Sequence, residues 1–436
     1  MNRDRSPVNA IECALAAAMA KFAEKRPKTR VLHERAVAVM PGGNTRSVLF
    51  TAPFPVRAEK AEGSTITDVD GHHYLDLLGE YSAGIYGHSH PGILAAVQRA
   101  LKMGLNLGAH HAQEVALAEV ITQRFNLDLV RFTNSGTEAN MMALAAARCF
   151  TSRKKIMPMV GGYHGGTLYF AHGASPVNAP FDCIMGHYNN VEKTRALIAR
   201  HADDLAAIIL EPMLGGGGCI AASREFLAML REETARRGIV LIFDEVMTSR
   251  LHPGGLSAKL GIEPDLKTLG KYIGGGMSFG AFGGRQAIME LFDPSKPEAL
   301  PHAGTFNNNT LTMTAGHAAM TEIYTPEACV ALNARGDSLR EALNDLFMRY
   351  QVRMKALGQG SMLTIHPLSG GITSPEDTEH ADKRLRQLLF LDLLDQGIYI
   401  AERRFMALSL MVVEEDCSRV AGAVERFITQ RHELLV

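Results

Sequence analysis

The chain has 436 residues, of which 46% are hydrophobic and 21% charged, and its 45 Lys and Arg nearly balance 46 Asp and Glu. This composition is typical of a globular protein of two or three domains and excludes a disordered or fibrous chain. A polyanion partner usually leaves a basic excess, so the net charge of −1 argues against a nucleic-acid-binding protein.

The N-terminal apolar stretch Cys13–Ala20 has a helical rather than a targeting pattern. Glu12 adjoins it, apolar residues recur at helical spacing, and Ser6-Pro7 is typical of a helix start. We expect an amphipathic helix that ends at Pro27 and not a signal peptide. Six scattered cysteines without a CxxC pair favour free thiols, and no apolar run nears the ~18 residues that cross a bilayer. The expected location is the cytoplasm.

The middle of the chain repeats one pattern, in which a short apolar run leads through a turn to a helix-like stretch. Such runs lie at Leu129–Thr133, Lys155–Val160, Leu205–Leu210 and Ile239–Phe243. They predict a mostly parallel sheet covered by helices on both faces, with ligands beyond the carboxyl ends of its strands. The large domain is expected over residues 75–320.

Beyond residue 320, the long helical stretches Pro326–Met348 and Thr378–Gln396 alternate with short strands. They predict a smaller α+β domain over residues 321–436. Residues 1–74 are expected to join this domain, as a helix and a short meander with Asp70-Gly71 at its turn.

Two glycine-containing turns could cradle a flat, phosphorylated ligand. In Asn134–Asn140, backbone N–H groups and the hydroxyls of Ser135 and Thr137 lie at a helix start, which suits a phosphate, although an ordinary N-cap is the alternative. In Gly161–Gly166, glycines would let a ring approach the backbone and Tyr163 could stack on it. A plain glycine-rich turn fits that segment equally well.

An acid and a lysine follow two later strands. Asp244 ends an apolar run, where a carboxylate needs a cationic or N–H partner, and a structural salt bridge is the alternative for it and for Glu245. Lys271 lies one helical crossover later among several glycines, which places it near Asp244. Lys259 and Lys267 lack that setting, so we expect both in solvent.

The sequence gives little support for a metal, ATP or NAD site. His88-Ser89-His90 and His110-His111 lack the framework of a metal site, so no metal is expected. Gly215–Gly218 and Gly274–Gly280 fit neither a P-loop nor GxGxxG, which disfavours ATP and NAD. Gly304–Asn309, with Thr305, predicts a turn and helix cap when it is taken alone.

Together these features are more specific than each is alone. A phosphate cup, a stacking aromatic ring, an acid and a lysine are what pyridoxal 5'-phosphate requires. The lysine holds its aldehyde as a Schiff base, and the carboxylate keeps the pyridine nitrogen protonated so that the ring accepts electrons.

The sequence resembles the class III aminotransferases, of fold type I among pyridoxal-phosphate enzymes. The matching segments are Gly87–Pro91, Asn134–Ala139, Gly162–Gly165, Glu211-Pro212, Phe243–Val246, Leu269–Lys271 and Gly304–Phe306. Pro41–Asn44 and Gly360–Met362 are similar to glutamate-1-semialdehyde 2,1-aminomutases. Aromatic β-amino-acid (β-phenylalanine) aminotransferases are similar at Asn44–Phe50, Met247–Arg250, Gly276–Gly280 and Thr305–Asn309. The implied fold is α/β, with a large domain built on a mostly parallel seven-stranded sheet and a smaller α+β domain.

The resemblance also implies roles for individual residues. Lys271 would be the Schiff-base lysine and general acid/base, and Asp244 would pair with the pyridine nitrogen. The other cofactor contacts would come from Ser135, Gly136, Thr137, Tyr163, His164, Glu211, Val246 or Met247, and Thr305 of the second subunit of a homodimer. Arg46 and Arg403 would bind substrate carboxylates. Relatives tend to have Gly at the position of Arg404 and Pro at that of Glu402. Whether Arg403 or Arg404 faces the pocket is therefore open.

The predicted function is transfer of the amino group of a β-amino acid, aromatic or otherwise apolar, to 2-oxoglutarate or pyruvate by a ping-pong mechanism. Two arginines suit this reaction, because the carboxylates of the two substrates lie at different distances from the reacting carbon. An aminomutase-type isomerase is the alternative, and a silent cofactor-binding dimer is disfavoured by the intact Lys271 and Asp244. The expected partners are amino acids, 2-oxo acids and a second copy of the chain, without nucleic acid or membrane.

Overall fold

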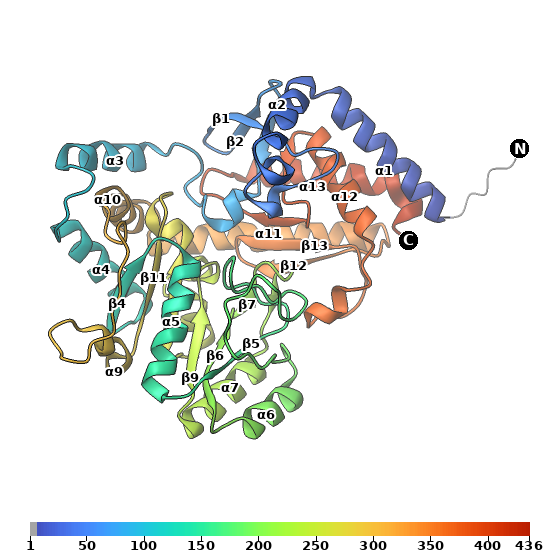
Figure 1. Cartoon of the computed structure of the whole chain (residues 1–436). Coiled ribbons are helices and arrows are strands. Elements are labelled where there is room, and N and C mark those ends of the chain that lie inside the picture. Colours follow the sequence, from blue (N-terminus) through green and yellow to red (C-terminus); the bar gives the residue numbers. More distant parts are fainter. Residues whose placement is uncertain (1–6) are drawn as a thin grey trace, which may run out of the picture.

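A six-stranded sheet organises the middle of the chain in the computed structural model, which describes residues 7–436 (Figure 1). Its strand order is β4-β11-β10-β9-β6-β5. Strand β11 is antiparallel to both of its neighbours, and the pairs β10–β9, β9–β6 and β6–β5 are parallel. These strands are β4 (Leu129–Thr133), β5 (Lys155–Pro158), β6 (Leu205–Leu210), β9 (Val240–Asp244), β10 (Leu266–Gly270) and β11 (Gly280–Gly284).

The sheet therefore has six strands rather than the predicted seven. Residues 182–186 lie beside the edge strand β5, where Cys183 and Gly186 form isolated parallel bridges to Ile156 and Met159. Backbone bonds run from Ile184 N to Ile156 O and from Gly186 N to Pro158 O, each 2.9 Å long. Because the pairing is confined to isolated bridges, this segment extends the sheet without forming a continuous strand.

Helices cover both faces of the sheet, as the apolar strands predict. Successive residues of a strand point to opposite faces. Ile156, Ala207, Ile209, Val240 and Ile242 pack with α5, and Met157, Ile208, Leu210, Leu241 and Phe243 pack with α6 and α7. The helices of this domain are α3 (Pro91–Met103), α4 (Ala112–Phe125), α5 (Gly136–Thr151), α6 (Val191–Arg200), α7 (Arg224–Arg237), α8 (Gly255–Leu260), α9 (Gln286–Met289) and α10 (Thr310–Ala318). A two-stranded ribbon, β7 (Met213–Leu214) and β8 (Ile220–Ala221), follows β6.

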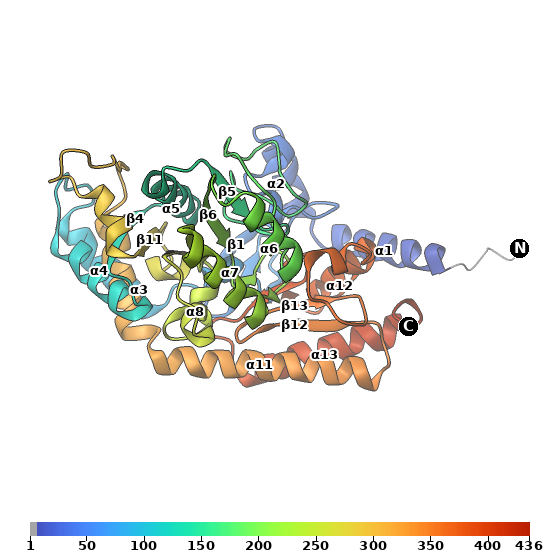
Figure 2. The ribbon, with the colours of Figure 1, turned by 90° about the horizontal axis from the view of Figure 1, so that it is seen from below.

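The two ends of the chain meet in a smaller unit, drawn above the large sheet in Figure 1. Its four-stranded sheet has the order β1-β2-β3-β14, in which β14 joins β3 in parallel through Ile398 and Leu75. Its elements are α1 (Pro7–Glu24), α2 (Pro27–Val37), β1 (Ala58–Glu62), β2 (Thr65–Asp68), β3 (His73–Asp76), α11 (Pro326–Arg349), β12 (Lys355–Gln359), β13 (Met362–His366), α12 (Lys383–Asp395), β14 (Ile398–Tyr399), β15 (Phe405–Ala407) and α13 (Glu414–Arg431). Figure 2 shows α11 and α13 side by side along the sheet formed by β12, β13 and β15.

Two predicted helix boundaries differ from the structure. Helix α12 begins at Lys383 rather than Thr378, because the Asp382 side chain accepts the N–H of Arg384 as its cap, and Pro375–Thr378 form a separate 3-10 turn. Pro27 opens helix α2 as well as following α1. The predicted cap at Ser6 lies outside the described residues.

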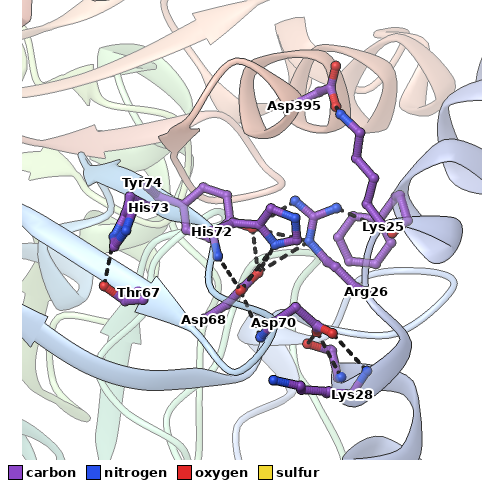
Figure 3. Close-up of polar contacts among 12 residues, drawn as sticks. Lys25, Arg26, Lys28, Thr67, Asp68, Asp70, His72, His73, Tyr74 and Asp395 are labelled. Atoms are coloured by element: carbon purple, nitrogen blue, oxygen red, sulfur yellow. Dashed lines mark hydrogen bonds and ion pairs between the residues drawn. The ribbon is translucent and has the colours of Figure 1, made fainter.

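A buried polar cluster attaches the N-terminal helices to the meander (Figure 3). Asp68 is fully buried and accepts a 2.6 Å hydrogen bond from the Tyr74 hydroxyl, which in turn accepts one of 2.7 Å from Arg26. The His72 ring lies 2.9 Å from the same carboxylate. Because a buried charge without partners is costly, this paired arrangement holds α1 and α2 in one position. Within residues 7–436, none of the helices is long and apolar enough to span a membrane.

Candidate active site

Asp244 lies at the carboxyl end of β9 and is 3% exposed. Its Oδ2 accepts a hydrogen bond from the Asn140 amide and lies near His164 Nδ1, both at 2.8 Å, and its Oδ1 accepts the N–H of Val246 at 3.0 Å. The Thr268 hydroxyl donates to Asn140 at 2.6 Å and so orients that amide. The carboxylate is thereby held in one orientation by three donors. Asn140 and Thr268 were not predicted as site residues, because neither stands out from its helix or strand in the sequence.

Lys271 follows β10, the parallel neighbour of β9, with Thr268 in register with Asp244. The predicted crossover thus brings the lysine and the acid to the same edge of the sheet. Lys271 has a left-handed φ of 54°, and its Nζ donates a 2.7 Å hydrogen bond to the carbonyl of Tyr81. Burial lowers the pKa of Lys271 to about 8, so its amine is neutral at a lower pH than an ordinary lysine.

The expectation that Lys267 lies in solvent was wrong. Lys267 is 2% exposed, and its Nζ donates to the carbonyl of Phe125 at 2.9 Å and pairs with Glu263 at 3.1 Å. It is buried because it lies inside β10, whose two faces are covered. Lys259 is exposed as expected.

The two glycine-rich turns meet at the start of α5. Ser135 caps the helix through a 3.2 Å bond from Glu138 N to its Oγ, and the first-turn N–H groups of a helix have no acceptor within it. Gly165 has a φ of 124°, and a Cβ there would lie 2.1 Å from Thr137 Oγ1. Gly166 N donates to the same hydroxyl at 3.3 Å. This end of α5 can therefore hold an anion the size of a phosphate.

Val246 and Met247 point in different directions. A Cβ on Gly136 would lie 2.8 Å from a Val246 methyl group, so Val246 packs directly against the start of α5. Met247 packs on the other side, where a Cβ on Gly215 would lie 2.5 Å from its sulfur. Val246 therefore contacts the predicted phosphate cup, and which of the two residues packs beneath the cofactor ring stays a prediction.

Glu211 ties two loops of the site together. It is 3% exposed, and its two oxygens accept the N–H groups of Tyr163 at 3.0 Å and Gly215 at 2.9 Å. Burial, with the negative charge of Asp244 nearby, raises the pKa of Glu211 to about 7. Tyr163 is 41% exposed, and its ring meets Tyr169 edge to face.

The segment Glu80–Ser82 was missed by the sequence reasoning. Its three residues have left-handed φ values of 49°, 51° and 76° although none is glycine, and such strain is typical of functional sites. Arg46 pairs with Glu80, and the Arg403 guanidinium lies 4.6 Å from the centre of the Tyr81 ring. Of the adjacent arginines Arg403 and Arg404, it is Arg403 that contacts this segment. The carbonyl of Tyr81 in the same segment accepts the hydrogen bond from Lys271.

Thr305 lies in an exposed turn beside the phosphate cup of its own chain. Asn307, two residues on, accepts a 2.9 Å hydrogen bond from the Asn134 amide. The contact of Thr305 with a second subunit stays a prediction. Among residues 7–436, no group of three or more His, Cys, Asp or Glu side chains is arranged to hold a metal ion.

The arrangement fits pyridoxal phosphate. A buried acid and a lysine lie at the ends of adjacent strands, a helix start can take the phosphate, and His164 Nε2 is buried without a hydrogen-bond partner in the described structure. The fold and this site define a pyridoxal-phosphate enzyme of fold type I. The class III aminotransferase family matches residues 50–427, and the chain belongs to that family.

Its relatives include the β-phenylalanine transaminase of Variovorax paradoxus, which is 49% identical over 427 residues, or 98% of each chain. The crystal structure of a β-phenylalanine aminotransferase from that organism superposes with a TM-score of 0.96 at 49% identity, covering 98% of this chain and 99% of that one. Glutamate-1-semialdehyde 2,1-aminomutase 2 of Lachnoclostridium phytofermentans is 37% identical over 401 residues, 87% of this chain and 94% of that one. The predicted family, fold class, transaminase activity and cofactor are confirmed.

Proposed function

We propose that this enzyme transfers the amino group of an aromatic or otherwise apolar β-amino acid to 2-oxoglutarate or pyruvate. The observation that carries the proposal is the shared contact of both arginines with one segment: Arg46 pairs with Glu80, and Arg403 covers Tyr81, which binds Lys271. Two guanidinium groups next to the reactive lysine suit two carboxylate substrates in turn. The 49% identity to a β-phenylalanine transaminase supports the donor class.

Each residue of the site has a physical task in this reaction. Bound pyridoxal phosphate supplies the carbonyl group that takes up the amine and a ring that accepts electrons. Lys271 Nζ, with its lowered pKa, moves a proton between the substrate carbon that carries the amino group and the carbonyl carbon of the cofactor. Asp244 holds a proton on the ring nitrogen, and Asn140 and His164 keep its carboxylate in place. The start of α5 binds the phosphate.

Glu80 has a separate task. Because Arg46 pairs with Glu80, an incoming substrate carboxylate must replace Glu80 as the partner of this guanidinium. Both side chains are about half exposed, so little desolvation opposes the exchange. The two clamps suit a ping-pong mechanism, in which Arg46 takes the carboxylate of the β-amino acid and Arg403 takes that of the 2-oxo acid.

Arg46→Ala is expected to lower kcat/KM for the β-amino donor, with a rise of ~2–4 kcal/mol in the activation free energy. The variant removes the partner of the substrate carboxylate. The half-reaction with glutamate should suffer less, and Arg403→Ala should show the reverse pattern. Stopped-flow measurement of each half-reaction separately tests this. Arg35→Ala, an exposed arginine on α2, is the matched control and should leave both half-reactions unchanged.

Equal losses for both substrates in both variants would contradict the two-clamp scheme. Conversion of glutamate-1-semialdehyde by the wild type, without turnover of any β-amino acid, would instead assign the enzyme to the aminomutases.

The active enzyme is proposed to be a homodimer with shared sites. Large apolar side chains are exposed along α3, the loop after it, α4 and the turn next to Thr305, and such a patch is typical of an interface. They are Leu94, Leu101, Met103, Leu105, Leu107, Val115 and Phe306. The loop after α3 contacts the start of α10, which directly follows the turn of Thr305, because Thr310 Oγ1 donates to Gly104 O at 2.7 Å. The patch therefore includes the turn that carries Thr305.

Mixing Thr305→Ala chains with Lys271→Ala chains is expected to restore activity. Each mixed dimer would hold one site with both defects and one with neither, so random exchange should leave about a quarter of all sites intact. The measurement is activity after exchange, with differently tagged subunits to prove that mixed dimers form. Unmodified chains mixed with Lys271→Ala chains give the upper reference. Proven exchange without recovery would place Thr305 in its own subunit's site.

A further inference from the structure

A cavity of about 310 Å³ adjoins the active site on the far side of Arg403. The glycine loop Gly215–Gly218 forms one wall, and β13, α12 and the turn before α12 form the others. Its lining is strongly basic: Lys383, Arg386, Arg403 and Arg404 face a single acidic residue of the lining, Glu379. An anion entering this space would meet an excess of positive charge.

Arg404 is the most unusual member of the lining. It is 3% exposed and has a φ of 67°, in the region that favours glycine. Its Nε donates to the carbonyl of Arg403 at 3.3 Å, but one terminal nitrogen is buried without a hydrogen-bond partner in the described structure. Burial, with Arg386 nearby, lowers its pKa well below the usual value. A buried cation left in this state calls for an anionic partner.

Two neighbouring arginines also have a buried guanidinium nitrogen without a hydrogen-bond partner within residues 7–436. The Nε atoms of Arg386 and Arg403 are also buried without partners among the described residues. His366 donates through Nε2 to Gly218 O at 2.8 Å, and burial and Arg404 lower its pKa to about 4, so it adds no positive charge near neutral pH.

The acidic residues near this cluster are engaged elsewhere or lie apart from the cavity. Asp382 pairs with Arg384 at 2.8 Å. Glu402 lines a different pocket together with Thr51. Among the described residues neither carboxylate forms a salt bridge with Arg386 or Arg404, although both act on Arg386 at longer range.

We propose that Arg404 and Arg386 form an anion-binding subsite in this cavity, which takes a carboxylate or an oxyanion of similar size next to Arg403. Two guanidinium groups offer the paired donors that such an anion prefers. The anion has two possible sources, a free oxyanion such as phosphate or the distal carboxylate of a dicarboxylic amino acceptor. The second source rests on the proposed function, because Arg403 lines the cavity and also covers Tyr81 at the active site.

The test is calorimetric titration of the holoenzyme, whose phosphate cup is already filled, with sodium phosphate and, separately, with glutarate. The wild type should bind at least one of these probes saturably, and Arg404→Gly should weaken that binding about tenfold or more. Glycine accepts the left-handed φ, so this variant removes the guanidinium without straining the backbone. Arg35→Ala, at an exposed arginine of α2 outside the lining, should bind as the wild type does.

Single-turnover kinetics then distinguish the two sources. If the subsite takes a distal carboxylate, Arg404→Gly raises the apparent Kd for 2-oxoglutarate and leaves that for pyruvate unchanged. If it takes a free oxyanion, phosphate binding is lost and neither 2-oxo acid is affected. Should Arg404→Gly not fold, Arg386→Gln replaces it.

No saturable binding of either probe to the wild type, or equal binding to wild type and Arg404→Gly, would overturn the subsite. The titration needs no turnover, so anion binding by an enzyme that converts no β-amino acid would remove the proposed function and leave the subsite intact.

Discussion

Alanine in place of Lys271 is expected to abolish measurable transamination, with a loss of at least about 10³-fold in kcat. The variant has no amine to hold the cofactor covalently or to move the proton. It should still fold and bind pyridoxal phosphate noncovalently, because the Lys271 side chain gives up one hydrogen bond, to the carbonyl of Tyr81. Steady-state kinetics and the absorbance of the purified protein measure both effects.

The wild type provides the direct check on this assignment. Borohydride reduction followed by peptide mapping should place the label on Lys271. Lys259→Ala is the matched surface control and should keep full activity. Label on another lysine, including the buried Lys267 of the preceding strand, would end the assignment.

Asp244→Asn should bind cofactor but lose ~10–10³-fold in kcat. An opposite charge of this kind shifts a pKa by ~1–3 units, so the neutral amide leaves the ring nitrogen mostly unprotonated and the ring a poor electron acceptor. The substitution keeps the shape of a side chain that is 3% exposed, so packing changes little. Kinetics at saturating cofactor, with the bound cofactor measured by absorbance, separate rate from binding.

Asp204→Asn, at an exposed acid before β6, is the control for loss of one carboxylate. A near-normal kcat in Asp244→Asn would remove this residue from its role beside the ring nitrogen.

Local patterns in the sequence predict much of this protein. Alternating apolar runs and helices predict the large sheet, and helix α5, at Gly136–Thr151, follows the apolar run Leu129–Thr133 as that pattern predicts. Asp244 and Lys271 could be placed together because parallel strands direct their carboxyl ends to one edge of a sheet. These features depend on residues close in sequence or on one right-handed crossover.

Contacts between distant segments explain what the sequence did not predict. The left-handed conformation of Glu80–Ser82 could not be predicted, because none of its residues is glycine. It accompanies the stacking of Tyr81 on Phe405, whose ring centres lie 5.8 Å apart. The interrupted edge of the large sheet depends in the same way on how residues 182–186 meet β5. Neither contact has a periodic pattern in the sequence.

The sequence by itself therefore determined the family and the cofactor and placed Lys271 and Asp244 at one edge of the sheet, because short motifs at the ends of strands carry this information. Only the tertiary structure decided between Arg403 and Arg404. The two are adjacent and chemically identical, but the φ of 67° at Arg404 sends the pair in different directions. Arg403 reaches the ring of Tyr81, and the buried Arg404 lines the neighbouring cavity.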